Sequence, residues 1–292
     1  MAEAHENVRK PSYKSSSLLN PWNVKPEDLS AFKEFRDEFE PYRAKVMPFP
    51  RVKPATVGVV FCKASEIQKD HLPAIKPAYK VPVWVNARDT IMPTWYAAVQ
   101  HALYPVRVVT SEDLSDEVGG GLRALVFPDA ACAEPAVVAA ARTFAARGGL
   151  VLAPDDAFRY DECFKKRADD LSFVTRVADV EAALTALAKA EVPRYATLEP
   201  LDDTEGPIRR ADVQVCDRGD FKLVCLAAMG GNAPRTARLR LTGLDGTGPW
   251  RVKDVVTGRV LDRAATADAL AEGFVLGLPP QERVVMVLEK AE

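Results

Sequence analysis

Histidine, paired cysteine motifs, excess positive charge and long apolar runs are scarce or missing in this chain of 292 residues. The three histidines are far apart and no CxxC or HxxxH spacing occurs, so the sequence gives a metal site little support. The net charge of −2 argues against a nucleic-acid binder, which needs a basic surface. No apolar run approaches the roughly 20 residues that cross a bilayer. We therefore expect no metal or cofactor, and neither nucleic acid nor membrane as a partner.

The five cysteines are odd in number and irregularly spaced, which suits reduced thiols better than a disulfide framework. The N-terminal sequence, MAEAHENVRKPSYKSSS, is polar and has no apolar core of a signal peptide. Both observations predict a cytoplasmic location. The hydrophobic content of 48% and charged content of 27% are typical of a globular protein.

Residues 122–153 carry the clearest structural signal. Residues 122–127 (LRALVF) are an apolar run of the kind that is buried in a parallel sheet, and residues 150–153 (LVLA) are another. Between them, Pro135 suits the first turn of a helix and Gly148-Gly149 suits its end. The pattern predicts a βαβ unit with a right-handed crossover.

The sequence before residue 194 continues the alternation of strands and helices. We expect strands at 55–61, 106–109 and 171–176, helices at 89–104 and 179–191, and a long irregular loop at 62–88. This order predicts a doubly wound, flavodoxin-like α/β domain over residues 51–193. Residues 1–50 are expected to be an N-terminal arm followed by an amphipathic helix at 26–40 with an aromatic stripe.

From about residue 194 the helical periodicity disappears. Seven short β-like runs follow, separated by turn signals, and they predict an antiparallel β-sandwich over residues 194–292. The runs are 213–216, 222–228, 237–241, 251–256, 258–261, 273–276 and 283–288.

Several of these segments resemble one family of enzymes. An apolar strand ending in Pro128, a helix ending in ARGGLVL and an acidic loop after the next strand resemble the glutamine-amidotransferase-like "trimerisation" domain of bacterial β-galactosidases. The C-terminal sequence VKDVVTGRVL…GFVLGLPPQERVVMVLE is similar to the small β-domain that closes many multidomain glycoside hydrolases. The resemblance covers residues 50–292 and implies a class I amidotransferase-like fold for the first domain.

A catalytic barrel is the part of those enzymes that this sequence does not match. A barrel takes about 250 residues, and only about 50 precede Ala55. Because the catalytic glutamates of the resembling enzymes lie on the barrel, no catalytic residue is carried over to this chain.

Amidotransferases use a cysteine nucleophile, so the cysteines near strand ends need separate consideration. Cys132 follows a predicted strand, but its neighbours Ala131 and Ala133 lack the glycines of a tight nucleophile elbow, and no histidine follows it in the sequence. Cys62 has His71 and His101 downstream, but a small buried core residue is the simpler interpretation. We expect no glutaminase chemistry.

The acidic loop 155–162 is the strongest candidate for a ligand site, because it follows a parallel strand, where α/β sheets bind ligands. Asp155 and Asp156 are candidate carboxylates, and Arg159 and Tyr160 are candidates to contact sugar hydroxyls. Trp84 and Trp95 are candidates to stack on a sugar ring. A solvated loop or a subunit contact is the alternative interpretation of the same residues.

The function expected from this sequence is a non-catalytic structural module of a β-galactosidase-like glycoside hydrolase system. It would self-associate as a homo-oligomer or bind a barrel-bearing subunit, and so help complete an active site on another chain. Two alternatives remain open: a stand-alone carbohydrate-binding protein that takes a saccharide, and a hydrolase that uses the 155–162 loop.

Overall fold

The structure is a computed structural model, and it describes residues 54–291 with internal gaps. The gaps are residues 74, 76, 78, 81–85, 115–120, 202–210, 218–220, 229–234, 247, 256 and 279–282. The expected arm and helix within residues 1–50 lie outside the described residues.

A five-stranded parallel sheet forms the first half of the described chain. Its strand order is β2-β1-β3-β4-β5, and every neighbouring pair is parallel. The strands follow the predicted apolar runs, although the run at 171–176 yields only two residues of strand. They are β1 (Val57–Phe61), β2 (Val106–Thr110), β3 (Ala124–Val126), β4 (Leu150–Ala153) and β5 (Thr175–Arg176).

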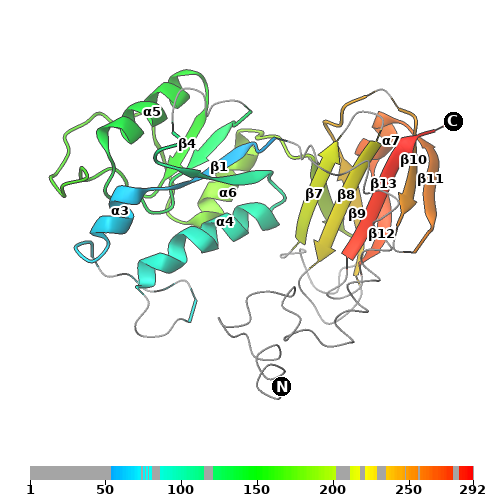
Figure 1. The fold of residues 1–292 in the computed structure, drawn as a ribbon, viewed down its shortest axis with the longest axis horizontal. Helices are drawn as coiled ribbons and strands as arrows, with labels where there is room; N and C mark the ends of the chain where they lie inside the picture. Colours follow the sequence, from blue (N-terminus) through cyan, green and yellow to red (C-terminus); the bar gives the residue numbers. More distant parts are fainter. Residues whose placement is uncertain are drawn as a thin grey trace, which may run out of the picture.

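Helices cover both faces of this sheet (Figure 1). On one face α5 (Pro135–Ala146) packs Val137 and Ala141 against strand residues such as Leu125. On the other face α4 (Ile91–His101) and α6 (Val180–Lys189) pack against the opposite side chains of the same strands. The strands are apolar on both faces because both faces are covered.

The predicted βαβ unit is present as β3, α5 and β4. Pro135 lies at the start of α5, as its missing N–H favours, and Gly148 follows the helix with φ of +87°. We expected residues 62–88 to form an irregular loop, but the structure has two short helices there. The α-helix α3 (Lys63–Gln68) lies inside this range, and the 3₁₀ helix η1 (Ala87–Thr90) begins at its end. Each is too short to produce a readable apolar period.

Gly58 is the second residue of β1, the strand between β2 and β3. A Cβ atom on Gly58 would lie 2.9 Å from Val109 Cγ2 of β2 and 3.0 Å from Leu125 Cδ2 of β3. Leu122 Cδ1 would be 3.2 Å away. The side chains of both neighbouring strands therefore close over the position where another residue would carry its side chain.

Two antiparallel sheets form the second half of the described chain. The larger has the order β11-β10-β13-β8-β7 and the smaller has the order β12-β9-β6. The two sheets share one core that includes Leu226, Met286 and Leu239, so they pack face to face as a sandwich. The strands are β6 (Ala196–Pro200), β7 (Ala211–Asp217), β8 (Phe221–Ala228), β9 (Arg235–Leu241), β10 (Trp250–Asp254), β11 (Val260–Ala265), β12 (Phe274–Leu278) and β13 (Arg283–Lys290).

The seven strands that we predicted here are all present with shifted ends, and β6 was missed. The helix α7 (Ala267–Glu272) was missed too; Thr266 caps it by accepting a hydrogen bond from Ala269 N. The fold is therefore an α/β part with a parallel sheet (residues 54–192), followed by an all-β part (residues 196–291).

The two parts meet at the amino ends of the parallel strands, so that the carboxyl ends of β1 and its neighbours point away from the all-β part (Figure 1). Hydrogen bonds join the α/β part to the all-β part and to the linker between them. Gln100 of α4 donates to the Asp212 carboxylate of β7 at 2.8 Å, and Thr56 donates to the Pro193 carbonyl at 2.8 Å.

Candidate functional site

The carboxyl ends of β1 and β3 form the edge of the sheet at which a site is expected. The chain passes from β1 to β2 on one side and then to β3 on the other, so the winding direction reverses between β1 and β3. In open α/β sheets, ligands bind outside the carboxyl ends of the strands at such a reversal. The segments that follow these strands therefore determine what the edge can bind.

A cavity of about 310 Å³ lies at this position. We call it the Arg88 cavity. It combines an apolar wall with a small number of charged groups, as small-molecule sites do. Its lining residues are Val60, Phe61, Cys62, Ser65, Glu66, Arg88, Asp89, Met92, Pro93 and Asp129.

Arg88 is the most buried charged residue of this cavity, with 6% of its surface exposed. It lies on η1, and the side chain of the N-cap residue Asn86 accepts a hydrogen bond from Arg88 N at 3.0 Å. The guanidinium donates through Nη1 to Asp129 Oδ1 at 2.7 Å and through Nη2 to the Pro73 carbonyl at 3.2 Å. Its Nε is buried and has no hydrogen-bond partner within the described residues.

Asp129, the partner of Arg88, follows β3 directly after Pro128. Burial raises the pKa of the Asp129 carboxyl above its usual value of 3.8. The Arg88 charge opposes that shift, whereas the charges of Asp156 and Glu66 add to it. Burial and the neighbouring acidic charges thus outweigh the Arg88 charge in their effect on the pKa of Asp129.

A second group of ion pairs includes two residues that line the Arg88 cavity, Glu66 and Asp89, which both contact Lys69. Lys69 Nζ contacts Glu66 Oε1 at 2.5 Å and Asp89 Oδ1 at 2.8 Å, and these two hydrogen bonds, that of Asp89 first, raise the pKa of Lys69. The ammonium thus neutralises part of the acidic charge on one side of the cavity.

Two cysteines lie beside the cavity, and neither is arranged as a nucleophile. The Cys62 thiol donates to the Cys132 carbonyl at 3.0 Å, and Ser65 Oγ both donates to that carbonyl and accepts from Cys132 N at 2.9 Å. Burial raises the pKa of Cys62 to about 12 and that of Cys132 to about 11. Both thiols stay protonated at neutral pH, whereas a nucleophilic cysteine needs a thiolate.

The sequence-predicted residues Asp155, Asp156, Arg159 and Tyr160 share one loop after β4, at the same edge of the sheet. Asp155 and Arg159 are exposed and Asp156 is half-buried. The Tyr160 ring stacks on Phe164 at a centroid distance of 4.4 Å, and its backbone pairs with Cys132 and Lys166. Asp156 is near enough to Asp129 to affect its pKa, but none of the four residues lines the Arg88 cavity.

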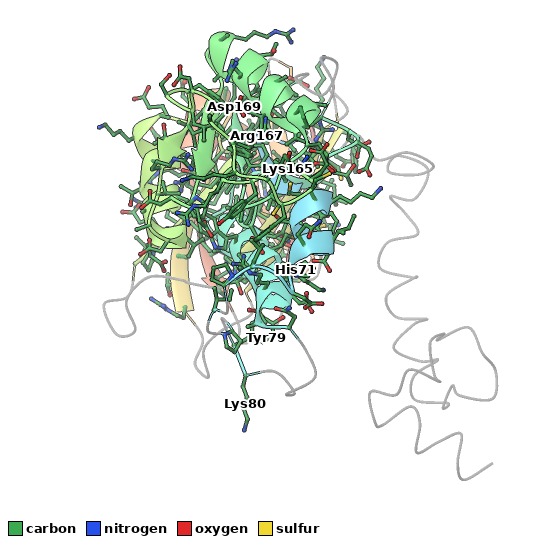
Figure 2. All side chains as sticks on the ribbon, turned by 90° about the vertical axis from the view of Figure 1, so that its left-hand side faces the viewer. His71, Tyr79, Lys80, Lys165, Arg167 and Asp169 are labelled. Carbon is green, nitrogen blue, oxygen red and sulfur yellow. The ribbon has the colours of Figure 1, made fainter. Side chains whose placement is uncertain are left out.

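The two predicted tryptophans are not brought to this loop. Trp95 lies on α4 with 8% of its surface exposed and packs in the core on the face of the sheet covered by α4 and α6. Trp84 lies outside the described residues. Three polar residues that follow the loop, Lys165, Arg167 and Asp169, lie near α5, whereas His71 lies below them beside α3 (Figure 2).

A second cavity, of about 410 Å³, lies between the two parts of the chain. We call it the junction cleft. The Gln100–Asp212 hydrogen bond lies in its lining, together with Tyr96, Tyr104 and Tyr195. At its edge Arg194 donates to the Tyr104 hydroxyl at 2.6 Å, and its guanidinium lies 4.1 Å from the centre of the Tyr104 ring. These contacts join the α/β part to the linker and to the all-β part.

Sequence reasoning missed Arg88 and Asp129, the two charged residues at the centre of the cavity. Asp129 had a signal, because it follows a buried strand of the predicted βαβ unit. Arg88 had none, because it lies in a segment without periodicity, 41 residues before the carboxylate that it binds. Among the described residues, no group of three or more His, Cys, Asp or Glu side chains is placed to hold a metal ion. None of the described helices has the length and apolar character needed to cross a membrane.

No protein-family profile matches the sequence, and no curated protein sequence matches it. The fold, in contrast, is similar to parts of solved glycoside hydrolases of family GH42. An exo-carrageenase GH42 from Bacteroides ovatus matches 92% of this chain with a TM-score of 0.62 and 15% identity. Two β-galactosidases, from Bacillus circulans sp. alkalophilus and a Gan42B catalytic mutant from G. stearothermophilus, match 90% and 94% with TM-scores of 0.58 and 11% identity.

The chain spans 33%, 45% and 44% of the length of these three structures, in the same order. At such low identities the likeness establishes the arrangement of the α/β part and the all-β part, and nothing about the chemistry of the chain.

Proposed function

We propose that this chain is a non-catalytic structural module of a β-galactosidase-like glycoside hydrolase system, and that it acts by self-association or by binding a barrel-bearing subunit. The observation that supports this is the coverage of the fold matches. They take in at least 90% of this chain but less than half of each of the three GH42 structures. The module would thus correspond to one region of a longer enzyme, and would support an active site supplied elsewhere.

The proposal includes the finer assignment of the α/β part as a flavodoxin-like, amidotransferase-like domain of the trimerisation type. The strand order 2-1-3-4-5 supports it, because flavodoxin-like sheets have this order. We place the domain limits at 51–193 and 194–292. The junction at Pro193 and Arg194, between α6 and β6, supports this division.

The absence of a catalytic role in this proposal is supported by the chemistry of the carboxyl edge. Cys62 and Cys132 are buried thiols with raised pKa values. In the acidic loop, Asp161 Oδ1 already accepts from Cys163 N and Lys165 N, which fixes a turn. Glycoside hydrolysis instead needs two carboxylates that face each other across a sugar, at roughly 5–10 Å.

The proposal places the protein in the cytoplasm. All five cysteines are free thiols, and a reducing compartment keeps thiols in that state.

The direct test is to measure mass and activity on the same preparation of the full chain. We expect light scattering after gel filtration to give a mass above 31.9 kDa, or a mixed complex when a barrel-bearing subunit is added. We also expect no hydrolysis of nitrophenyl galactosides by the chain alone. A monomer that binds no such subunit would overturn the assembly role, and hydrolysis by the purified chain would overturn the non-catalytic role.

A matched pair of variants tests which part associates. Val108 is 48% exposed on β2, an edge strand of the parallel sheet, and Val275 is 58% exposed on β12, an edge strand of the all-β part. An exposed edge strand favours pairing with another chain, and a lysine there opposes it. We expect Val108→Lys to lower the association constant and Val275→Lys to leave it unchanged. The opposite result would assign association to the all-β part.

The alternative of a hydrolase acting through the acidic loop has a separate test. If the chain does hydrolyse a glycoside, Asp155→Ala and Asp156→Ala should each remove most of the activity. Activity that persists in both variants would exclude this loop as the site.

A further inference from the structure

We propose that the Arg88 cavity binds one neutral saccharide unit, through two neighbouring hydroxyl groups that contact Arg88 Nε and the Asp129 carboxylate. This inference goes beyond the structural role proposed above and does not depend on it, because every residue it uses lies in the α/β part of a single chain.

The first step is the incomplete hydrogen bonding of Arg88. Two of the guanidinium nitrogens have acceptors, Asp129 and the Pro73 carbonyl, but Nε has none, although it is buried. Buried donors are paired in the great majority of cases, because an unpaired one loses its bonds to water without replacement. Arg88 lines the cavity, but Nε itself has almost no accessible surface, so an acceptor in the cavity reaches it only when the Arg88 side chain shifts toward the ligand.

The second step is the charge of the surroundings, which argues against an anion. Asp129 already compensates Arg88, and Glu66 and Asp89 also line the cavity. Lys69 at the rim contacts both of the latter carboxylates. Two cations therefore face three carboxylates, and a further negative charge would be repelled.

A cationic ligand fits no better, because an ammonium group has donors only and cannot accept from Arg88 Nε. The group needed is one that accepts from Arg88 and donates to Asp129. A hydroxyl group can both accept and donate. Arg88 and Asp129 are in contact at 2.7 Å, so the donor and the acceptor that they offer are close together. Two hydroxyl groups on adjacent carbons are close together in the same way.

The third step is the shape and polarity of the wall. Val60, Phe61, Met92 and Pro93 give the cavity an apolar side opposite its polar residues. A pyranose ring has the same division, with C–H groups on its faces and hydroxyls on its edge. The volume of about 310 Å³ is at the small end of the usual range for ligand pockets, roughly 300–1,000 Å³, and suits one sugar unit.

The experiment uses methionine methyl groups as probes in the full chain. Of the five methionines, Met92 lines the cavity and Met286 is fully buried in the core of the all-β part, where it is an internal control. The chain is labelled with ¹³C-methyl methionine and titrated with D-galactose and D-glucose. We expect the Met92 resonance to shift and saturate for at least one of them, and the Met286 resonance to stay in place. A monosaccharide-sized ligand should show a dissociation constant of about 1–10 mM.

Two controls test the chemistry of the contact. Tetrahydropyran-2-methanol keeps the ring and one hydroxyl but has no neighbouring pair, and we expect it to bind at least about tenfold more weakly. Arg88→Lys keeps the positive charge but removes the Nε–H donor, and should weaken sugar binding by a similar factor. Asp155→Asn changes a carboxylate of the adjacent loop that does not line the cavity, and should leave binding unchanged. Far-UV circular dichroism and the position of the Met92 resonance without sugar report whether the α/β part of each variant is folded.

Several results would overturn the proposal. One is the absence of any Met92 shift with either sugar. Another is a shift that is equal for tetrahydropyran-2-methanol, or unaffected by Arg88→Lys in a folded protein. A third is a saturable Met92 shift with inorganic phosphate or acetate in place of the sugars, which would identify the cavity as an anion site.

Discussion

Among the described residues, each part of this chain contains one buried ion pair, and the two pairs differ in how many of their polar atoms have hydrogen-bond partners. In the all-β part, Lys222 and Asp217 are 0% and 1% exposed. Lys222 Nζ donates to Asp217 Oδ1 and to the Asp245 carbonyl and lies 4.1 Å from the centre of the Trp250 ring. Asp217 Oδ2 accepts from Asp245 N at 2.7 Å. Both oxygens of the carboxylate are thus used within the protein.

The pair in the α/β part is left incomplete. Arg88 retains a buried Nε–H without a partner, and the Asp129 side chain is 17% exposed at the wall of a cavity. The Lys222–Asp217 pair, whose polar atoms bond within the protein, can hold strands together, and we call it the closed pair. The Arg88–Asp129 pair, which has an unpaired donor at the carboxyl edge of a sheet, can offer groups to a ligand, and we call it the open pair. The saccharide site proposed above makes use of this difference, because it places the ligand at the incomplete pair.

The largest effect should come from breaking the closed pair. Lys222→Met leaves the Asp217 carboxylate buried with one backbone donor, and we expect it to lower the free energy of unfolding by about 3–5 kcal/mol. Chemical denaturation followed by Trp fluorescence measures it. The double variant Lys222→Met with Asp217→Asn should recover part of the loss, because no uncompensated charge remains. A loss below about 1 kcal/mol would mean that the pair is not a structural element.

Breaking the open pair should cost less. Arg88→Met removes the partner of Asp129, but this carboxylate reaches water through the cavity, so we expect a loss of about 1–3 kcal/mol in the same denaturation measurement. A loss as large as that of Lys222→Met would contradict the distinction between the two pairs.

The open pair should also show a pH dependence of a defined sign. The pKa of Asp129 is raised in the folded protein, so the folded state binds this proton at a higher pH than the unfolded state does. The contribution of Asp129 to stability is lowest above the folded pKa and rises as the pH falls toward its usual value of 3.8. We expect the unfolding free energy of wild type minus that of Asp129→Asn to increase from pH 7 to about pH 4. A decrease would mean that Arg88 lowers the pKa of Asp129 by more than burial raises it.

The smallest effect should come from an exposed pair in the all-β part. Glu199 contacts Arg240 at 2.6 Å, but the two side chains are 46% and 35% exposed. We expect Glu199→Ala to change stability by about 0–1 kcal/mol, with the remaining effect lost in high salt. A loss comparable to that of Lys222→Met would show that charge, rather than burial, accounts for the effects of the buried pairs.

The parts of the fold that were predictable are those with local signals. The unit β3–α5–β4 carries its apolar runs, its helix-starting Pro135 and its helix-ending Gly148 within about 30 residues, so neighbouring residues determine it. The strand β6 was missed because Ala196–Pro200 ends in a proline and becomes a strand by pairing with β9, about 40 residues later.

The candidate site was predictable only in its location. The sequence analysis chose the carboxyl ends of the parallel strands because the acidic loop follows one of them, but that loop does not line the Arg88 cavity. The central ion pair was not found, because Arg88 meets Asp129 through tertiary packing of η1 on the sheet, which no local pattern encodes. Trp95 was proposed as a stacking surface but serves the core, since helical spacing alone does not distinguish a buried aromatic face from an exposed one.

The lack of a side chain at Gly58 affects the position of the residues that follow it at the carboxyl end of β1. Val109 and Leu125 close over this residue from the two flanking strands, so a Cβ atom at this position would force one of these side chains or β1 to move. Val60, Phe61 and Cys62 follow within four residues and line the Arg88 cavity. The absence of a methyl group at residue 58 thus helps to fix the position of the cavity wall. We expect Gly58→Ala to displace that wall.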